Sequence, residues 1–351
     1  MPSRMIPTKG YAAQDATSPV APFSFERRTP GPNDILITIT HCGVCHTDIH
    51  MSRNEWGGAL YPMVPGHEII GRIAQIGSEV TKFSVGEQAG VGCFIDSCRT
   101  CSSCNEGLEN YCENQVTGTY NSLARDGGTP NYGGYSNQIV VDEHFVLKVS
   151  DKIDPAAAAP LLCAGITTYS PLRHWKVGPG QKVGVVGLGG LGHMALKFAH
   201  SFGAHVTCFT TSAGKAADAK RLGADEVILS SSPEEMKKAG GTFDFILDTV
   251  SAPHDLGSYL DLLKRDGVLC LVGVPPETAA VHASSLVMGR KQLAGSLVGG
   301  MPETQEMLDY CAEHGIISDV EVIPMAQINQ AYERIIKGDV KYRFVIDMAT
   351  L

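Results

Sequence analysis

The feature of this sequence that most constrains its fold is a glycine-rich turn after an apolar run. The run Lys182–Val186 ends at Gly187, and three further glycines follow within five residues. Glycine allows a tight turn and a close backbone approach, and the next residues have a helical pattern. This context predicts that a dinucleotide pyrophosphate rests on the helix N-terminus. A flexible glycine-rich loop is the alternative. The predicted contacts are Gly187, Leu188, Gly189, Gly190, Leu191 and Gly192.

After Lys182 apolar strands alternate with helical patterns, which predicts a doubly wound parallel sheet of the Rossmann type. The expected strands are Val183–Gly187, His205–Phe209, Glu226–Leu229, Asp244–Asp248, Val268–Val272 and Leu293–Val298. The expected helices include Gly190–Phe202 and Ala213–Leu222. We assign residues 153–299 to this domain.

The first 150 residues have a different pattern from the alternation after Lys182: short β-branched strands separated by turns. Ile35–Thr40, Glu68–Ile73 and Asn137–Val141 are examples. Such a pattern predicts a β-rich, partly barrel-like domain. A chain of 351 residues exceeds the usual size of one core, so two domains are expected. The tail holds a predicted helix, Pro302–His314, and a last strand, Arg343–Ile346. We assign residues 1–152 and 300–351 to the first domain.

Four cysteines follow one another closely in Cys98-x2-Cys101-x2-Cys104-x7-Cys112. Four thiolates on one short lobe, residues 93–115, can close a tetrahedral zinc site that leaves no position for substrate. An iron–sulfur cluster or a chance grouping of thiols are the alternatives. A ferredoxin-type cluster has other spacings and usually a proline after its last cysteine. The spacing predicts a structural zinc site.

A second metal site is suggested by Cys45 and by His67 in Gly66-His67-Glu68. With Cys163 as a third ligand, two sulfurs and one nitrogen would suit a catalytic zinc with an open fourth position. Each residue also has a simpler interpretation. Cys42 and Cys45 could form a redox pair, His67 could be a structural group, and Cys163 could be a small buried apolar side chain. The spacing alone leaves these alternatives open.

Composition excludes several classes of function. The net charge of −9 disfavours nucleic acid and anionic membranes as partners. No apolar run approaches the length needed to span a bilayer, and the first residues lack an apolar signal core. The cysteines fit metal binding in a reducing compartment better than a disulfide framework. A cytoplasmic protein is expected.

The residues after the second expected strand of the parallel sheet indicate which dinucleotide is bound. An NAD enzyme presents Asp or Glu there, to the ribose hydroxyls. This chain has Thr210, Thr211, Ser212 and, one turn later, Lys215. Hydroxyls and an ammonium would bind a 2′-phosphate, so NADP(H) is predicted. A solvated lysine at a helix start is the alternative interpretation of Lys215.

With these motifs in hand, the chain resembles the zinc-dependent medium-chain dehydrogenase/reductases of the cinnamyl-alcohol-dehydrogenase group. It is most similar to bacterial NADPH aldehyde reductases of broad substrate range. The resemblance covers nearly the whole length. Its motifs are Cys42–Asp48, Gly66–Glu68, the four-cysteine lobe, Pro160–Gly165, Gly187–Gly192 and Asp339–Phe344.

The resemblance implies a fold and a role for each matching residue. The first domain would be GroES-like and closed by the C-terminal tail, and homodimers would form through the Rossmann sheet edge. Cys45, His67 and Cys163 match the catalytic zinc ligands, giving two zinc ions per chain. Glu68 matches a glutamate that approaches zinc during ligand exchange, and Asp48 an acid that orients the zinc-binding histidine. Thr47 and His50 match the proton relay, with Thr47 also at the cofactor. Further cofactor contacts match Thr167, Thr249, Gly273, Leu297, Val298, Gly299 and Arg343.

The resemblance thus implies a zinc-dependent alcohol dehydrogenase or aldehyde reductase acting with NADP(H) on small or aromatic alcohols and aldehydes. One departure bears on the substrate. Plant cinnamyl-alcohol enzymes carry a Trp shortly before a Tyr-Asn pair, where this chain has Gly118 before Tyr120-Asn121. Trp56 and Tyr61 are candidate pocket walls. The alternatives are an NAD-dependent polyol or formaldehyde dehydrogenase on the same fold, or a non-catalytic zinc- or nucleotide-binding relative.

Overall fold

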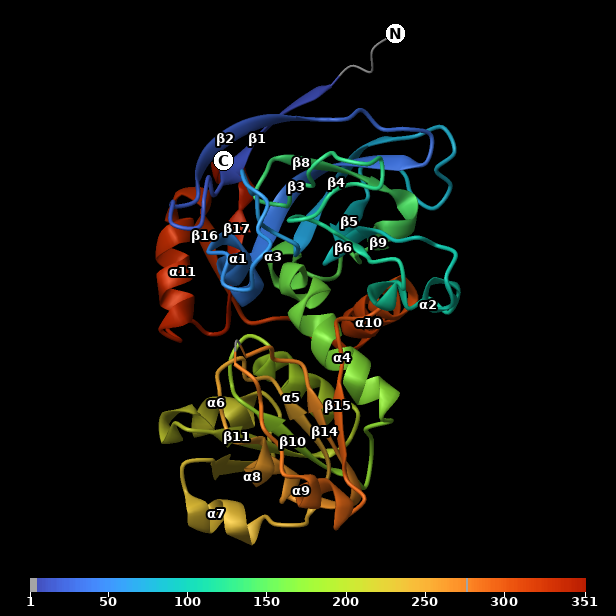
Figure 1. Ribbon diagram of the computed structural model, residues 1–351. Coiled ribbons are helices and arrows are strands. Elements are labelled where there is room, and N and C mark those ends of the chain that lie inside the picture. Colours follow the sequence, from blue (N-terminus) through green and yellow to red (C-terminus); the bar gives the residue numbers. More distant parts are fainter. Residues whose placement is uncertain (1–4, 276) are drawn as a thin grey trace. The chain divides into compact units, whose positions relative to one another are not determined.

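The computed structural model describes residues 5–275 and 277–351, which form two compact units (Figure 1). Unit one holds the residues up to Cys163 together with Gly299–Leu351, and unit two is Ala164–Val298. The first division falls later than the predicted 152/153 because helix α3 (Pro155–Ala158) and the 3-10 helix Ala159–Leu162 pack on strands of unit one. Cys163 therefore belongs to unit one. The second division falls at 298/299, one residue before the predicted one.

Unit one is built on a mixed sheet with β3 (Asp34–Val44) near its middle. The strand order is β16-β17-β3-β4-β5-β9, and β8 also pairs with β3. The ladders are antiparallel except between β16 and β17, which run parallel. The other members are β4 (Ile69–Ile76), β5 (Gln88–Val91), β8 (Gln138–Asp142), β9 (Leu147–Lys148), β16 (Val320–Pro324) and β17 (Arg343–Asp347).

Shorter elements surround this sheet. Strands β1 (Ile6–Ala12) and β2 (Ala21–Arg27) form an antiparallel pair, as do β6 (Phe94–Asp96) and β7 (Thr117–Gly118). The helices are α1 (His46–Ser52), α2 (Ser102–Asn105), α10 (Met301–His314) and α11 (Ile328–Ile336). Helix α10 has Pro302 in its first turn and ends at Gly315 in the left-handed conformation, the usual start and stop signals of a helix.

Unit two contains a six-stranded, all-parallel sheet with the order β12-β11-β10-β13-β14-β15, the doubly wound arrangement predicted from the sequence. The strands are β10 (Lys182–Val186), β11 (His205–Thr210), β12 (Glu226–Leu229), β13 (Phe243–Asp248), β14 (Leu263–Leu271) and β15 (Gln292–Gly295). The helices are α4 (Ala164–His174), α5 (Gly192–Ser201), α6 (Ala216–Arg221), α7 (Pro233–Lys238), α8 (Leu256–Leu260) and α9 (Ala283–Val287).

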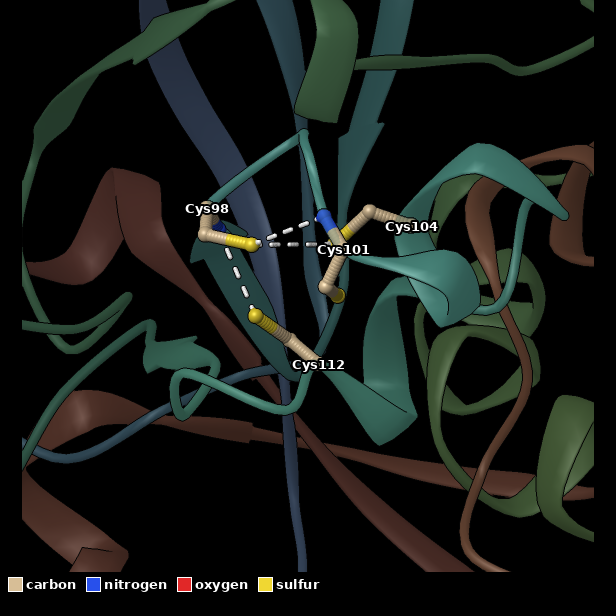
Figure 2. A group of neighbouring side chains, drawn as sticks. All are labelled: Cys98, Cys101, Cys104 and Cys112. Atoms are coloured by element: carbon tan, nitrogen blue, oxygen red, sulfur yellow. Dashed lines mark hydrogen bonds between the residues drawn. The ribbon is translucent and has the colours of Figure 1, made fainter.

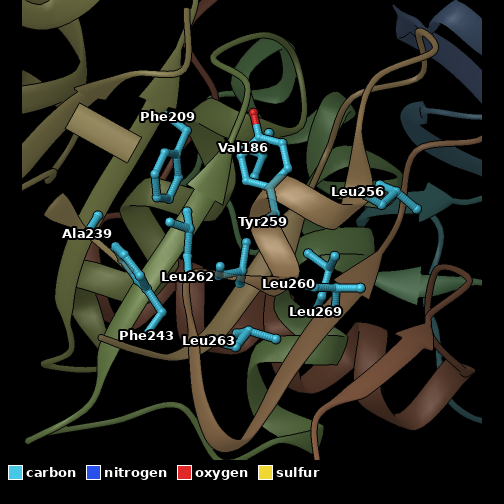
Figure 3. Close-up of a cluster of buried hydrophobic side chains, with 11 residues drawn as sticks. Val186, Phe209, Ala239, Phe243, Leu256, Tyr259, Leu260, Leu262, Leu263 and Leu269 are labelled. Carbon is cyan, nitrogen blue, oxygen red and sulfur yellow. The ribbon is translucent and has the colours of Figure 1, made fainter. Parts of the chain in front are cut away.

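The middle strands of this sheet are almost wholly buried, as expected for parallel strands covered on both faces. One cluster of buried side chains joins β13 and β14 to α8 (Figure 3). Phe209, Phe243 and Tyr259 contribute aromatic rings, and Leu260 and Leu263 fill the space beside them. This core packs along the strands from Phe243 and Leu263, at the amino ends of β13 and β14, to Phe209 near the carboxyl end of β11. Ligands bind at the carboxyl ends of the strands in such sheets.

No helix within the described ranges combines the length and the hydropathy required to cross a membrane.

Candidate functional site

The four lobe cysteines lie together as the spacing predicts. The sulfurs of Cys98, Cys101, Cys104 and Cys112 all lie within 4.8 Å of one another, and Figure 2 shows the four side chains converging. Cys101 caps the short helix α2, which carries Cys104, and Cys112 ends a 3-10 turn. The group consists only of sulfur donors. Its chemistry fits a zinc ion held in a closed tetrahedral shell.

Backbone and side-chain donors point at these sulfurs. The amide of Cys98 donates to Sγ of Cys112 over 3.4 Å, and the amide of Cys101 to Sγ of Cys98 over 3.4 Å. Hydrogen bonds lower the pKa of Cys98 to about 5, and the bond from the Asn114 side chain has the largest effect. Donors of this kind stabilise thiolates, which are the form that binds metal.

The lobe also contacts the helix that returns to unit one. A carboxylate oxygen of Glu109 accepts a 2.9 Å hydrogen bond from the amide of Met301, the first residue of α10. The other oxygen lies 2.9 Å from Nε2 of His144. Gly300 packs so closely on the Gly107 carbonyl that a side chain at position 300 would collide with it. The lobe therefore supplies the cap that Gly300, having no side chain, cannot give.

A second group of side chains that could hold a metal ion lies at the end of β3. Atoms of Cys45, His67, Glu68 and Cys163 all lie within 4.8 Å of one another, and all four residues are buried. Cys45 follows β3 and His67 precedes β4. These strands are antiparallel neighbours, and the Gly43 amide donates to the Glu68 carbonyl over 2.9 Å. Cys163 is brought in by the 3-10 helix Ala159–Leu162. Two sulfurs, one nitrogen and a carboxylate fit a zinc site of the catalytic type.

Asp48 holds this second group in place. It is fully buried, and its carboxylate lies 3.2 Å from Nδ1 of His67. It also accepts hydrogen bonds from the amides of Cys45 and Gly66, at 2.9 and 3.1 Å, and from the Tyr135 hydroxyl at 3.3 Å. A carboxylate beside Nδ1 favours a proton on that nitrogen, which leaves Nε2 free to bind a metal.

Two groups of the cluster, Cys45 and Glu68, have shifted pKa values. A hydrogen bond from Cys163, whose sulfur is 3.9 Å away, lowers the pKa of Cys45 well below its usual range. Burial raises the pKa of Glu68 to about 7, although Arg343 opposes this shift. Glu68 pairs with Arg343 through one oxygen, whereas its buried Oε2 has no hydrogen-bond partner in the described chain. A buried carboxylate oxygen without a partner, beside two sulfurs and a ring nitrogen, fits the ligand set of a metal ion.

The predicted relay residues lie on α1, directly after Cys45. Thr47 is half-buried in the first turn. His50 is half-buried, contacts Glu55 through Nδ1 and stacks on Trp56 with ring centroids 4.7 Å apart. Trp56 is thus held by His50, and Tyr61 donates its hydroxyl to the Ser52 carbonyl over 2.7 Å. These contacts leave the proposed pocket roles of Trp56 and Tyr61 as predictions.

Gly118 ends the two-residue strand β7, and its carbonyl accepts hydrogen bonds from Ser122 and Asn131. An added side chain there would meet the Tyr120 carbonyl oxygen at 2.9 Å. Tyr120 itself was missed by the sequence analysis as a site residue. Its ring stacks on His67, with centroids 5.8 Å apart.

Two other residues near the cluster were also missed. Tyr135 donates to Asp48, as described above, and the Cys93 thiol donates to the carbonyl of Leu162, the residue before Cys163, over 3.7 Å. Neither has a spacing relative to Cys45 or His67 that indicates a metal site. Their positions follow from the pairing of the sheet, which the local sequence does not reveal.

In unit two, the glycine-rich turn takes the predicted form. Gly187 follows β10 with φ 90°, and α5 begins at Gly192. A side chain at position 192 would collide with the Gly187 carbonyl. Gly189 is exposed, with nothing within 4 Å of an added side chain, and it lies just before a ten-residue helix, which fits a bound pyrophosphate.

The residues predicted to bind the 2′-phosphate lie beside this turn. Thr210 is buried at the end of β11, whereas Thr211 and Ser212 are exposed. Lys215 reaches back to the turn and donates from Nζ to the Leu188 carbonyl over 3.0 Å. This contact places the ammonium at the edge of the glycine turn, so it is more than a solvated surface charge.

The remaining predicted cofactor residues fall in both units. Thr167 is buried in α4, and Thr249 donates to the Val186 carbonyl over 2.7 Å, beside the glycine turn. Gly273 follows β14. Leu297 is exposed and Val298 has φ 39°. Gly299 and Arg343 belong to unit one, where Arg343 is 6% exposed and pairs with Glu68. The expected phosphate contact of Arg343 stays a prediction.

Comparison with known proteins assigns a family to both parts of the chain. Residues 31–151 match the alcohol dehydrogenase GroES-like domain, and residues 190–313 match the zinc-binding dehydrogenases. The aldehyde reductase YahK of Escherichia coli is 57% identical over 348 residues, covering 98% of this chain and 99% of the relative.

Two solved structures agree with this assignment. A cinnamyl alcohol dehydrogenase from Sorghum bicolor superimposes with a TM-score of 0.95 at 46% identity, over 98% of each chain. The CAD from Helicobacter pylori, complexed with NADP(H), gives a TM-score of 0.94 at 41% identity over 99% of each chain. These matches confirm the predicted resemblance and fold class: the chain belongs to the zinc-binding alcohol dehydrogenases, with a GroES-like domain and a Rossmann-type parallel sheet.

Proposed function

We propose that this chain is a zinc-dependent alcohol dehydrogenase and aldehyde reductase that uses NADP(H). The observation that carries the proposal is the buried group of Cys45, His67 and Cys163, with the Glu68 carboxylate beside it. A non-catalytic relative would need only the closed four-cysteine site for its stability. The aldehyde reductase activity named for the E. coli relative supports the same reaction class.

Cys45, His67 and Cys163 would hold the catalytic zinc. When bound there, zinc would polarise the oxygen of an alcohol or aldehyde. NADPH would supply the hydride in aldehyde reduction, and NADP⁺ would accept it in alcohol oxidation. Asp48 keeps the His67 ring oriented with a proton on Nδ1. Cys98, Cys101, Cys104 and Cys112 would hold a second, structural zinc.

Thr47 is the proposed proton acceptor of alcohol oxidation. Its hydroxyl oxygen takes the proton of the alcohol and passes it toward His50, at the outer end of α1. His50 contacts the exposed carboxylate of Glu55, which gives the proton a route to solvent. Both residues are half-buried, as a path between a buried site and water requires.

NADP(H) is preferred over NAD(H) because of the end of β11. Thr211, Ser212 and Lys215 offer hydroxyls and one ammonium, where an NAD-selective site has a carboxylate. The NADP(H) bound by the H. pylori structure supports this choice over an NAD-dependent polyol or formaldehyde dehydrogenase.

Oxidation of NADPH, followed by its absorbance with a panel of aliphatic and aromatic aldehydes, tests the proposed function. We expect turnover with several aldehydes and a much higher kcat/KM for NADPH than for NADH. Lys215→Ala should weaken NADPH use by roughly ten- to a hundredfold and leave NADH use almost unchanged, because one charge-assisted contact to phosphate is lost. Equal losses with both cofactors would contradict the role of Lys215. The absence of turnover with every aldehyde tested would contradict the proposed enzymatic function.

We also propose a homodimer formed through the edge strand β15. Val287 and Met288, just before this strand, are 75% and 88% exposed, and Leu293 on it is also exposed. An unpaired edge with apolar neighbours can join the same edge of a second copy. Light scattering should show a dimer for the wild type and a shift to monomer for Leu293→Asp.

We further propose a cytoplasmic location. None of the eleven cysteines forms a disulfide, which fits a reducing environment.

A further inference from the structure

The buried carboxylate of Asp48, which lies beside His67, is surrounded by hydrogen-bond donors. Its Oδ1 lies 3.2 Å from Nδ1 of His67 and accepts from the Gly66 amide at 3.1 Å. Its Oδ2 accepts from the Cys45 amide at 2.9 Å and from the Tyr135 hydroxyl at 3.3 Å. The first three donors belong to candidate metal ligands or to the residue beside one. The hydroxyl of Tyr135 is the donor that comes from a separate part of the chain.

Tyr135 is fully buried, and its position is fixed from two sides. Its amide donates to the Pro65 carbonyl over 2.9 Å, which bonds it to the segment that leads into His67. Its carbonyl accepts a 2.9 Å hydrogen bond from the Tyr11 amide of β1. The ring packs so closely on Gly66, which has φ 103°, that a side chain there would meet the ring at 2.7 Å. The hydroxyl is therefore held toward the carboxylate by contacts of both the backbone and the ring.

A guanidinium group holds the segment that carries Tyr135. Nη2 of Arg27, the last residue of β2, donates to the carbonyls of Tyr132 and Gly133 at 2.9 and 3.1 Å. The same nitrogen lies 3.0 Å from the Ser136 hydroxyl oxygen, which accepts from it. One side chain thus bonds the segment on both sides of Tyr135. The hairpin of β1 and β2 thereby contributes to the position of a hydroxyl beside the candidate metal ligands.

The Tyr135 hydroxyl restricts how the Asp48 carboxylate can turn. Each carboxylate oxygen has two donors, so a rotation of the group would break contacts on both oxygens. Without the hydroxyl, Oδ2 would keep the Cys45 amide, and less would oppose a rotation that moves Oδ1 away from His67. Hydrogen bonds to a charged acceptor are among the stronger ones, and a buried acceptor that loses its donor is destabilised. A less well oriented His67 ring binds a metal ion more weakly.

We propose that Tyr135 is a positioning residue of the second metal site: its hydroxyl fixes the Asp48 carboxylate, and through it the His67 ring, in the orientation that binds zinc. This inference rests on the proposed catalytic zinc at Cys45, His67 and Cys163. Because Tyr135 acts through Asp48, its effect on zinc affinity should depend on the carboxylate. The lobe zinc has its own four ligands and should not be affected.

Tyr135→Phe keeps the ring that packs on Gly66 and removes only the hydroxyl. We expect the zinc Kd of the second site, measured by competition with a chelating dye, to rise about tenfold, the low end of the range for groups that orient a metal-binding histidine. The lobe zinc should be released as in the wild type. Tyr332→Phe is the matched control and should keep wild-type zinc affinity. Tyr332 lies on α11, which packs on α1; it is 3% exposed, and its hydroxyl has no hydrogen-bond partner among the described residues.

The Asp48→Asn background separates positioning from packing. There the charged acceptor is absent, so adding Tyr135→Phe should change the zinc Kd of the second site by less than about twofold, a clear departure from additivity. An equal, tenfold loss in both backgrounds would show that Tyr135 acts through packing and would overturn the proposal. Wild-type zinc affinity in the single variant Tyr135→Phe would also overturn it. A wild-type protein that binds zinc at the lobe alone would instead overturn the proposed function.

Discussion

The two groups of candidate metal ligands in unit one are assembled in opposite ways. The ligands of the lobe all come from the segment Cys98–Cys112, are only sulfur, and are mostly half-buried. Those of the second group come from three distant parts of the chain, combine sulfur, nitrogen and carboxylate, and are all buried. Asp48 and Arg343 add charges around the second group, whereas backbone amides dominate around the first. A local, closed site stabilises its lobe; a long-range, mixed site can exchange a ligand for substrate.

The largest expected effect on turnover is that of Cys163→Ala. It removes one of three ligands from the second group, so aldehyde reduction should fall to background while the fold survives. Metal analysis should show about one zinc per chain instead of two. Cys42→Ala, which removes another buried thiol of the same strand region, is the control and should keep both zinc ions. A Cys163→Ala enzyme with two tightly bound zinc ions would mean that the difference between the sites is misassigned.

Thr47→Val should have the next largest effect. Valine keeps the size of the side chain but removes the hydroxyl that accepts the alcohol proton, so kcat for alcohol oxidation should fall by about 10²-fold or more. Zinc content should not change. His50→Gln, at the outer end of the relay, should cost less because water can replace it. Near-normal oxidation by Thr47→Val, measured at saturating alcohol, would exclude the relay.

Asp48→Asn should weaken zinc at the second site alone. The amide can still accept hydrogen bonds but loses the charge that favours the His67 tautomer, so zinc affinity or activity should drop by roughly 10- to 100-fold. Titration with a chelator should release one zinc early and the lobe zinc as in the wild type. If both zinc ions leave together, the two sites are coupled in a way that the structure does not suggest.

Cys101→Ser should change turnover least and stability most. The lobe loses a thiolate and with it much of the folding energy that zinc supplies. The unfolding temperature should fall by roughly 5 °C or more, and the yield with it. The kcat per folded molecule should fall no more than a few-fold. A variant that melts like the wild type, followed by calorimetry, would show that the lobe does not depend on its metal.

The sequence predicted the parallel sheet well because its strands are apolar and its turn is rich in glycine. Strand β12 spans the predicted Glu226–Leu229. Strand β10 is displaced by one residue, and β13 begins one residue early but ends at the predicted Asp248. Strand β14 begins at Leu263, five residues before the predicted start. The prediction missed this part of the strand because Lys264, Arg265 and Asp266 are polar and exposed, unlike the apolar residues that follow. Strand β15 ends at Gly295, before the predicted Val298, whose backbone has φ 39° and cannot continue a strand.

The site was predictable where its residues are close in sequence. The four lobe cysteines could be recognised by spacing alone, whereas Cys163 depends on how the helix Ala159–Leu162 packs on unit one. The residues alone left Cys163 as a candidate ligand or a small buried side chain, and the family resemblance decided between these interpretations. Tyr120 and Tyr135 reach the site through the folding of long loops, and no local pattern marks them.

The contact between Glu109 and the start of α10 couples the lobe to a distant helix. The free energy of metal loading is linked to the order of a helix almost two hundred residues away, since one carboxylate of the lobe satisfies the first amide of α10. Occupancy of the four thiolates should therefore be measurable at a distance, as slower hydrogen exchange of the Met301 amide. The metal content of the lobe would then change the local stability of the segment where the chain re-enters unit one.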